Sequence, residues 1–138
     1  MLLRSWWVLI LVNSHSEGKK YTLKEILEDL LSNISEIKGA AVVSVEGFPL
    51  ESIMGPNIDE IRIAAMTAAI LSLGERAAQE LQKGFLEQIF IRGINGFLFV
   101  MSAGENAVLV VDTEKNVKLG LLFLECQRAC KKIADIVW

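Results

Sequence analysis

Residues 39–52, GAAVVSVEGFPLES, decide the fold because they predict a strand, a tight turn and a second strand. The first strand, Ala40–Val45, is apolar at consecutive positions, so both of its faces are expected to be buried. The turn around Gly47 carries no nucleophile, no phosphate-binding loop and no cluster of metal ligands, and the second strand covers about Leu50–Ile53. A strand buried on both faces needs cover on both sides of its sheet, which predicts three layers.

The rest of the chain supplies that cover. Thr22 and Glu25 form a capping box that starts a helix, which Gly39 is expected to end. Asn57 is expected to cap a second, long helix, which stops at Gly84. The predicted elements are helices over about residues 23–37, 58–83 and 117–137 and strands over about 40–45, 50–53, 86–91, 97–102 and 107–111. The order α-β-β-α-β-β-β-α predicts an α/β (α+β) fold, a three-layer α-β-α sandwich with a five-stranded, mostly antiparallel sheet.

Composition limits the classes of function. The chain has 138 residues, which favours one domain, and we place that domain at residues 22–138. Its net charge is −3 and its basic residues are scattered, so nucleic acid is not expected as a partner. The hydrophobic fraction of 52% is high for a small domain, which indicates a surface that meets a partner. Two cysteines are typical of a reducing compartment, and we expect a cytoplasmic protein.

Residues 1–21 are predicted to be an N-terminal extension. Its first part, Met1–Val12, reads MLLRSWWVLILV, one positive charge followed by a short apolar run. The run is too short for a transmembrane helix, which needs about 20 residues, and no signal-peptide cleavage site follows it. We therefore expect an extra strand or helix that packs on the domain, and no membrane partner.

The second helix carries apolar residues almost all round, which is unusual for a helix that meets water. At 100° per residue, the stripe expected to face the sheet consists of Ile63, Met66, Ile70, Leu73, Ala77 and Leu81. In the first half of the helix the opposite side is also apolar, and small alanines there would let another backbone approach closely. The interface predicted on this side consists of Ile61, Ala64, Ala65, Ala68, Leu71 and Ser72.

No residue is assigned to catalysis, to cofactor binding or to a metal. Cys126 and Cys130 share a helix face at a spacing of four, but zinc usually needs four ligands, so two buried apolar side chains are expected. The single histidine, His15, precedes the first helix and is a poor candidate for a catalytic triad. An enzyme is therefore not expected.

Four stretches in this order resemble the roadblock family of dynein light chains and its bacterial and archaeal relatives. They are IKGAAVVSVEGFPLES, DEIRIAAMTAAILSLGERAAQEL, GFLEQIFIRGINGFLFVMSAGENAVLVV and NVKLGLLFLECQRACKKIADIV. The resemblance as a whole covers about Leu23 to Val137. The resemblance implies a profilin-like roadblock domain that forms a homodimer through its third strands, with the two second helices side by side. Prokaryotic single-domain members are similar to GTPase-activating partners of gliding-motility GTPases, which implies a GTPase contact at Ala64, Ala65, Ala68 and Ser72.

The function expected on these grounds is a non-enzymatic, dimeric scaffold or regulator that binds a Ras-like small GTPase through the second helix. The alternative is a small-molecule sensor, because the architecture is similar to profilin, longin and PAS-like domains. A sensor needs a cavity lined by a few convergent polar groups. The predicted inner faces consist of Val, Ile, Leu and Phe, which favours a filled core and the scaffold.

Overall fold

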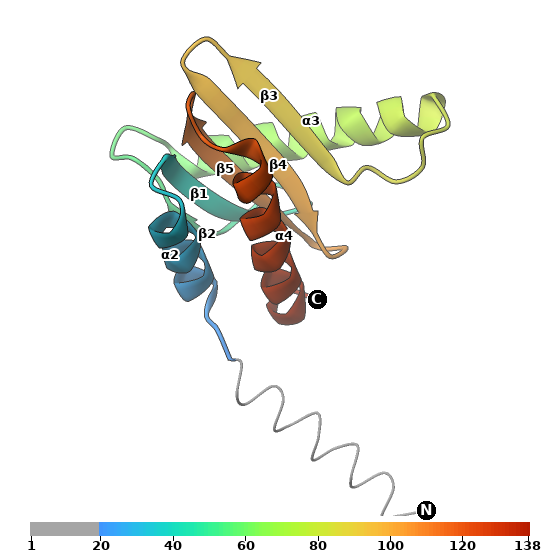
Figure 1. Cartoon of the computed structure of the whole chain (residues 1–138). Coiled ribbons are helices and arrows are strands. Elements are labelled where there is room, and N and C mark those ends of the chain that lie inside the picture. The colour runs from blue at the N-terminus through green and yellow to red at the C-terminus, as the bar shows by residue number, and fades with distance from the viewer. Residues whose placement is uncertain (1–19) are drawn as a thin grey trace, which may run out of the picture.

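The computed structural model describes residues 20–138, so the extension predicted over residues 1–21 lies almost entirely outside the described residues. The element order α-β-β-α-β-β-β-α is confirmed (Figure 1). The elements are α2 (Leu23–Asn33), β1 (Ile37–Ser44), β2 (Pro49–Ile53), α3 (Glu60–Glu80), β3 (Gln88–Gly93), β4 (Gly96–Ala103), β5 (Ala107–Glu114) and α4 (Leu119–Ile136). Among the described residues, no helix combines the length and the apolar content needed to cross a membrane.

The five strands form one antiparallel sheet in the order β2-β1-β5-β4-β3, which leaves β2 and β3 at its two edges. The two halves of the chain meet at the centre, where Val42 of β1 lies opposite Leu109 of β5. Helix α3 lies on one face of the sheet, and α2 and α4 lie on the other (Figure 1). The predicted three-layer sandwich is therefore confirmed.

Strand β1 is buried on both faces, as its sequence predicts. Ala40 and Val42 belong to the cluster beneath α2 and α4, whereas Ala41 and Val43 belong to the cluster beneath α3. Strand β5 divides its apolar side chains between the two clusters in the same way. Two cores, one on each face, explain why a chain of this size carries so many apolar residues in its strands.

The first helix begins as predicted and ends earlier. The backbone N–H of Glu25 donates to Thr22 Oγ1 at 3.1 Å, and the N–H of Thr22 donates to Glu25 Oε1 at 3.3 Å, which completes the capping box. The helix ends at Asn33 rather than near Ile37, because Ile37 already starts β1 and is buried there. The burial of Ile37 in β1 outweighs the helical pattern that predicts a longer helix.

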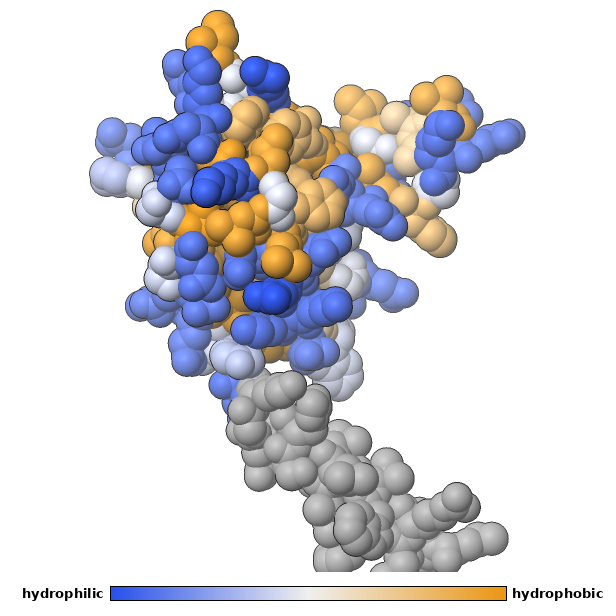
Figure 2. Space-filling model, viewed as in Figure 1, coloured by the Kyte–Doolittle hydropathy of each residue, from blue (hydrophilic) through white to orange (hydrophobic). Residues whose placement is uncertain are grey.

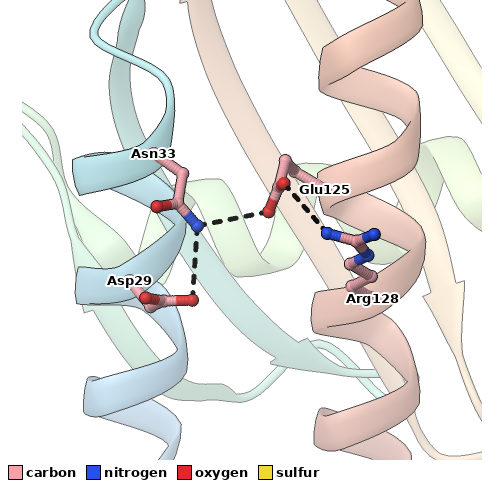
Figure 3. Close-up of polar contacts among 4 residues, drawn as sticks. All are labelled: Asp29, Asn33, Glu125 and Arg128. Atoms are coloured by element: carbon pink, nitrogen blue, oxygen red, sulfur yellow. Dashed lines mark hydrogen bonds and ion pairs between the residues drawn. The ribbon is translucent and has the colours of Figure 1, made fainter.

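A polar cluster joins α2 to α4 (Figure 3). Asn33 Nδ2 donates to Asp29 Oδ2 at 3.4 Å on its own helix and to Glu125 Oε2 at 3.3 Å on α4. Arg128 Nη1 lies 3.5 Å from Glu125 Oε1, one turn further along α4. Each bond is long and partly exposed, so the cluster orients the two helices more than it stabilises them.

Candidate partner interface

Helix α3 begins at an acidic cap. Asp59 Oδ1 accepts hydrogen bonds from the backbone N–H groups of Ile61, at 3.0 Å, and Arg62, at 3.4 Å. The prediction that Asn57 caps this helix is wrong, because a turn separates Asn57 from its first residue. The helix ends at Glu80, and Gly84 with φ +87° lies in the loop that leads to β3.

The face that α3 turns to the sheet is not the predicted one. Its buried residues are Ala64, Thr67 and Leu71. By contrast, Met66 is 49% exposed and Leu73 is 71% exposed, although both were expected to face the sheet. The predicted stripe is therefore wrong for Met66, Leu73, Ala77 and Leu81, which are exposed, whereas Ile63 packs on the core beneath the helix and Ile70 is partly buried. The helix is rotated so that Met66 and Leu73 point outward.

The physical reason is close approach between backbones. A Cβ placed on Gly47, in the turn between β1 and β2, would lie only 3.3 Å from the Cβ of Ala68. A Cβ on Gly74 would meet Ile89 Cδ1 of β3 at 3.1 Å. Helix α3 thus rests on the turn and on β3 through its small residues, and a larger side chain at these contacts would push it away.

The predicted interface residues are consequently divided between two sides of the helix. Ala64 and Leu71 are buried against the sheet, so assigning them to an outward surface was wrong. Ala68 is partly buried beside Gly47. Ile61, Ala65 and Ser72 are exposed, and their contact with a partner stays a prediction.

We define the outer face of α3 as its exposed residues opposite the sheet. Two large apolar side chains, Met66 and Leu73, lie on it with small alanines between them. Arg62 and Arg76 are exposed and fall on the same side by helical spacing. The outer face consists of Arg62, Ala65, Met66, Ala69, Leu73, Arg76 and Ala77. Sequence reasoning missed Met66, Ala69 and Leu73, and the signal that could have found them is the run of small residues at Ala64, Ala68 and Gly74.

The apolar surface continues from α3 to the sheet edge at β3. Leu81 and Phe85, at the end of α3 and in the loop after it, are 69% and 88% exposed. Figure 2 shows hydrophobic surface at this projecting end of α3. On β3 itself Ile91 is 39% exposed and lies opposite Leu98 of β4. Within residues 20–138, no strand pairs with the other side of β3.

The two cysteines of α4 are buried. Burial raises the pKa of the Cys126 thiol to about 12, and Glu125 adds to the rise. Burial also raises the pKa of the Cys130 thiol to about 12, with Cys126 beside it as the lesser cause. Their assignment as buried apolar side chains is confirmed. Within residues 20–138, no group of three or more His, Cys, Asp and Glu side chains could hold a metal ion.

Comparison with known families matches residues 23–113 to the Roadblock/LC7 domain. The chain belongs to the Roadblock/LC7 family. It is also 37% identical over 103 residues to the uncharacterized protein MJ1340 of Methanocaldococcus jannaschii, a match that covers 75% of this chain and 90% of that protein. The family match lies within the domain predicted from the sequence.

Solved roadblock structures share the fold. Myxococcus xanthus MglB aligns with a TM-score of 0.79 at 22% identity, over 86% of this chain and 97% of its own. The gliding protein MglB of Thermus thermophilus aligns with a TM-score of 0.74 at 24% identity, over 83% and 87%. The resemblance to a roadblock protein of gliding motility, inferred from the sequence, is confirmed at the level of the fold.

Proposed function

We propose that this roadblock protein is a homodimeric, non-enzymatic scaffold that binds and regulates a Ras-like small GTPase through the outer face of α3. The observation that carries the proposal is that Met66 and Leu73 of α3 point away from the sheet, on a surface that continues toward the edge strand β3. Monomeric proteins rarely expose an apolar surface of this extent without a partner. Residues 22–138 are the functional unit in this proposal.

The dimer would form along β3. An edge strand presents unpaired backbone N–H and C=O groups, and a second β3 would pair with them to make one continuous sheet. The outer face of α3 lies next to this edge, so two copies of α3 would come side by side across the seam. Ala65, Ala69 and Ala77 leave room for that approach, and helices pack about 8–10 Å apart when the contacting side chains permit.

The GTPase would bind where the paired helices leave their N-terminal halves exposed. Ile61 offers an apolar anchor there, and Ala65 offers a shallow surface one turn further on, while Ser72 continues this side into the second half of the helix. Arg62 adds a positive charge to the same area. Support for a GTPase as the partner comes from the family resemblance. Support for the location comes from Ile61, Ala65 and Ser72, the residues of the predicted interface that are exposed.

The alternative function, a small-molecule sensor, has weaker support. A sensor encloses most of its ligand in a pocket with a few convergent polar groups. The two cavities described along α4, of about 120 Å³ and about 470 Å³, both open to the surface, and the volume under α3 is filled by apolar side chains. The scaffold is the function that this geometry supports better.

The proposal is tested by association state and by capture of the partner. The full chain, tagged and purified from its native host, should sediment as a dimer at micromolar concentration and bring down a small GTPase with bound guanine nucleotide. Ala69→Arg should abolish dimer formation, GTPase capture or both, because it inserts bulk and charge at the centre of the outer face. Losses at interface hot spots reach about 2 kcal/mol or more.

The matched control is Ser32→Arg, which adds the same charge on α2, across the sheet from α3. Ala68 is not used, because arginine there would collide with the Gly47 turn and confuse folding with binding. A monomeric wild-type chain, or equal binding by Ala69→Arg and Ser32→Arg, would show that the outer face of α3 is not the interface.

A further inference from the structure

A groove runs between α4 and β3 on the face opposite α3. Its volume is about 470 Å³. The groove is lined by Phe123, Gln127 and Cys130 of α4, by Leu86 and Gln88 beside or on β3, and by Met101 of β4. It exists because α4 packs over β4 and β5, and β3 extends beyond the cover that α4 provides. We call it the α4–β3 groove.

The floor of this groove continues into an aromatic row. The Phe99 ring lies 5.7 Å from Phe123 and 6.3 Å from Phe90. Phe90 is 41% exposed at the open end of the row. Figure 2 shows hydrophobic surface around α4 and β3 on this face. The rim is polar, with Glu87, Gln88, Gln127 and Lys131 around the apolar floor. An apolar floor with a polar rim suits an amphipathic aromatic side chain.

The N-terminal segment of the chain contains two amphipathic aromatic side chains of this kind. Trp6 and Trp7 lie within the apolar run Met1–Val12, outside the described residues. A buried indole has a large apolar body and one N–H donor that needs an acceptor. The groove offers both: the apolar floor for the rings, and the carboxylate of Glu87 or the amide oxygens of Gln88 and Gln127 for the N–H.

The described chain starts beside α4, within reach of the groove. The Nζ of Lys132 lies 4.4 Å from the centre of the Tyr21 ring, on the side of α4 that faces α2. The groove is on the other side of the same helix, so the path crosses one helix, about 10–12 Å wide with its side chains. Residues 13–20 can span up to about 26 Å when extended, at about 3.3 Å per residue. The polar stretch NSHSEGKK is therefore long enough to connect Tyr21 to the groove.

We propose that the α4–β3 groove is the docking site for the chain's own segment Met1–Val12, with an indole of Trp6 or Trp7 seated on the aromatic floor. This goes beyond the proposed function, because the groove lies on the opposite face of the sheet from α3. The docked segment covers Phe90 and Phe123 and leaves the outer face of α3 free. Its release would expose a second apolar surface.

Cross-linking in the full chain tests the proposal. One cysteine replaces Ser5, next to Trp6, and a second replaces Gln127 in the groove. Both native cysteines are replaced by alanine, so that Cys130, which lines the groove, cannot take part in the cross-link. A short bismaleimide should join Ser5→Cys to Gln127→Cys about tenfold faster than it joins Ser5→Cys to Arg128→Cys, since a free tether gives neighbouring sites similar effective concentrations. Arg128 follows Gln127 on α4 and its side chain is 64% exposed on the side facing α2.

A second measurement follows the indoles directly. Trp138 is 92% exposed, so Trp138→Phe leaves Trp6 and Trp7 as reporters. In that variant, acrylamide should quench the remaining fluorescence much less in the native chain than in urea. Equal cross-linking at positions 127 and 128 would overturn the proposal, as would a product that joins two chains. Indoles that become shielded only after anionic lipid vesicles are added would overturn it in favour of a membrane contact.

Discussion

The turn between β1 and β2 lies against α3 with the Ala68 methyl group between them: a Cβ on Gly47 would lie 3.3 Å from the Cβ of Ala68. Gly47 has φ +99°, a conformation that residues with a Cβ rarely adopt. This contact determines which side of α3 faces the sheet. It thereby determines that Met66 and Leu73 point away from the sheet.

Gly47→Ala should lower the free energy of unfolding by about 1–3 kcal/mol, the usual cost of holding a side chain in such a backbone conformation. The crowding against Ala68 adds to that strain. Gly55→Ala is the control, because nothing lies within 4 Å of a Cβ built there. Urea unfolding of both variants at one protein concentration measures the difference, and equal stabilities would mean that the turn does not hold α3 in place.

Leu71→Ala should mainly lower the stability of the protomer, whereas Leu73→Ala should mainly weaken association. The Leu71 side chain is buried between α3 and the sheet, so its truncation should lower the free energy of unfolding of the protomer by about 2–5 kcal/mol. Leu73 points outward, so its truncation should change protomer stability by only about 0.5 kcal/mol and weaken association instead. Thermal unfolding at a concentration low enough to separate the copies, together with sedimentation equilibrium, distinguishes the two. A large stability loss from Leu73→Ala alone would restore the stripe predicted from the sequence.

The two sheet edges provide a matched pair for locating the dimer. Ile91 on β3 is 39% exposed and Leu50 on β2 is 40% exposed. A lysine on an edge strand opposes pairing with another strand. Ile91→Lys should therefore yield a monomer, whereas Leu50→Lys should remain dimeric, as measured by sedimentation equilibrium. The reverse result would place the dimer at β2.

Cys126 and Cys130 should not react with thiol reagents until the protein unfolds. Burial raises the pKa of each thiol to about 12, and only the thiolate reacts. Unfolded thiols lose their protons near the ordinary pKa of 9.0, whereas the folded thiols keep theirs up to about pH 12. The folded state therefore binds more protons over this window, and the free energy of unfolding falls as pH rises from about 9 toward 12. Rapid labelling by Ellman's reagent at pH 8 without denaturant would contradict this assignment.

The sequence predicts the strands better than the helix that matters most for function. The double-sided burial of β1 could be predicted because Ala40–Val45 is apolar at consecutive positions, and the capping box could be predicted because Thr22 and Glu25 are local partners. The fold class follows from these elements and their order. Each of these features depends on residues close together in the chain.

The rotation of α3 could not be predicted in the same way, because both sides of the helix are apolar. Periodicity assigns the larger side chains to the core, which holds when the space between helix and sheet must be filled. Here the close contacts of Gly47 with Ala68 and of Gly74 with Ile89 set how the helix lies, and they turn Ala64, Thr67 and Leu71 to the sheet. That orientation is set by a turn and a strand outside α3, which the periodicity of the helix does not report, so Ala64 and Leu71 were assigned to the wrong side.

The pairing of β1 with β5 has a consequence for how the protein is made. Val42 and Val43 leave the ribosome early, but their partners Leu109 and Val108 are translated only after α3, β3 and β4. Until then the hairpin of β1 and β2 has one open side of apolar strand, and a two-stranded hairpin is marginally stable in water. Such late, long-range pairing slows folding and leaves strands open to aggregation. The nascent chain is thus most prone to aggregation before β5 has been translated. Slowing translation after residue 80 should increase its dependence on chaperones.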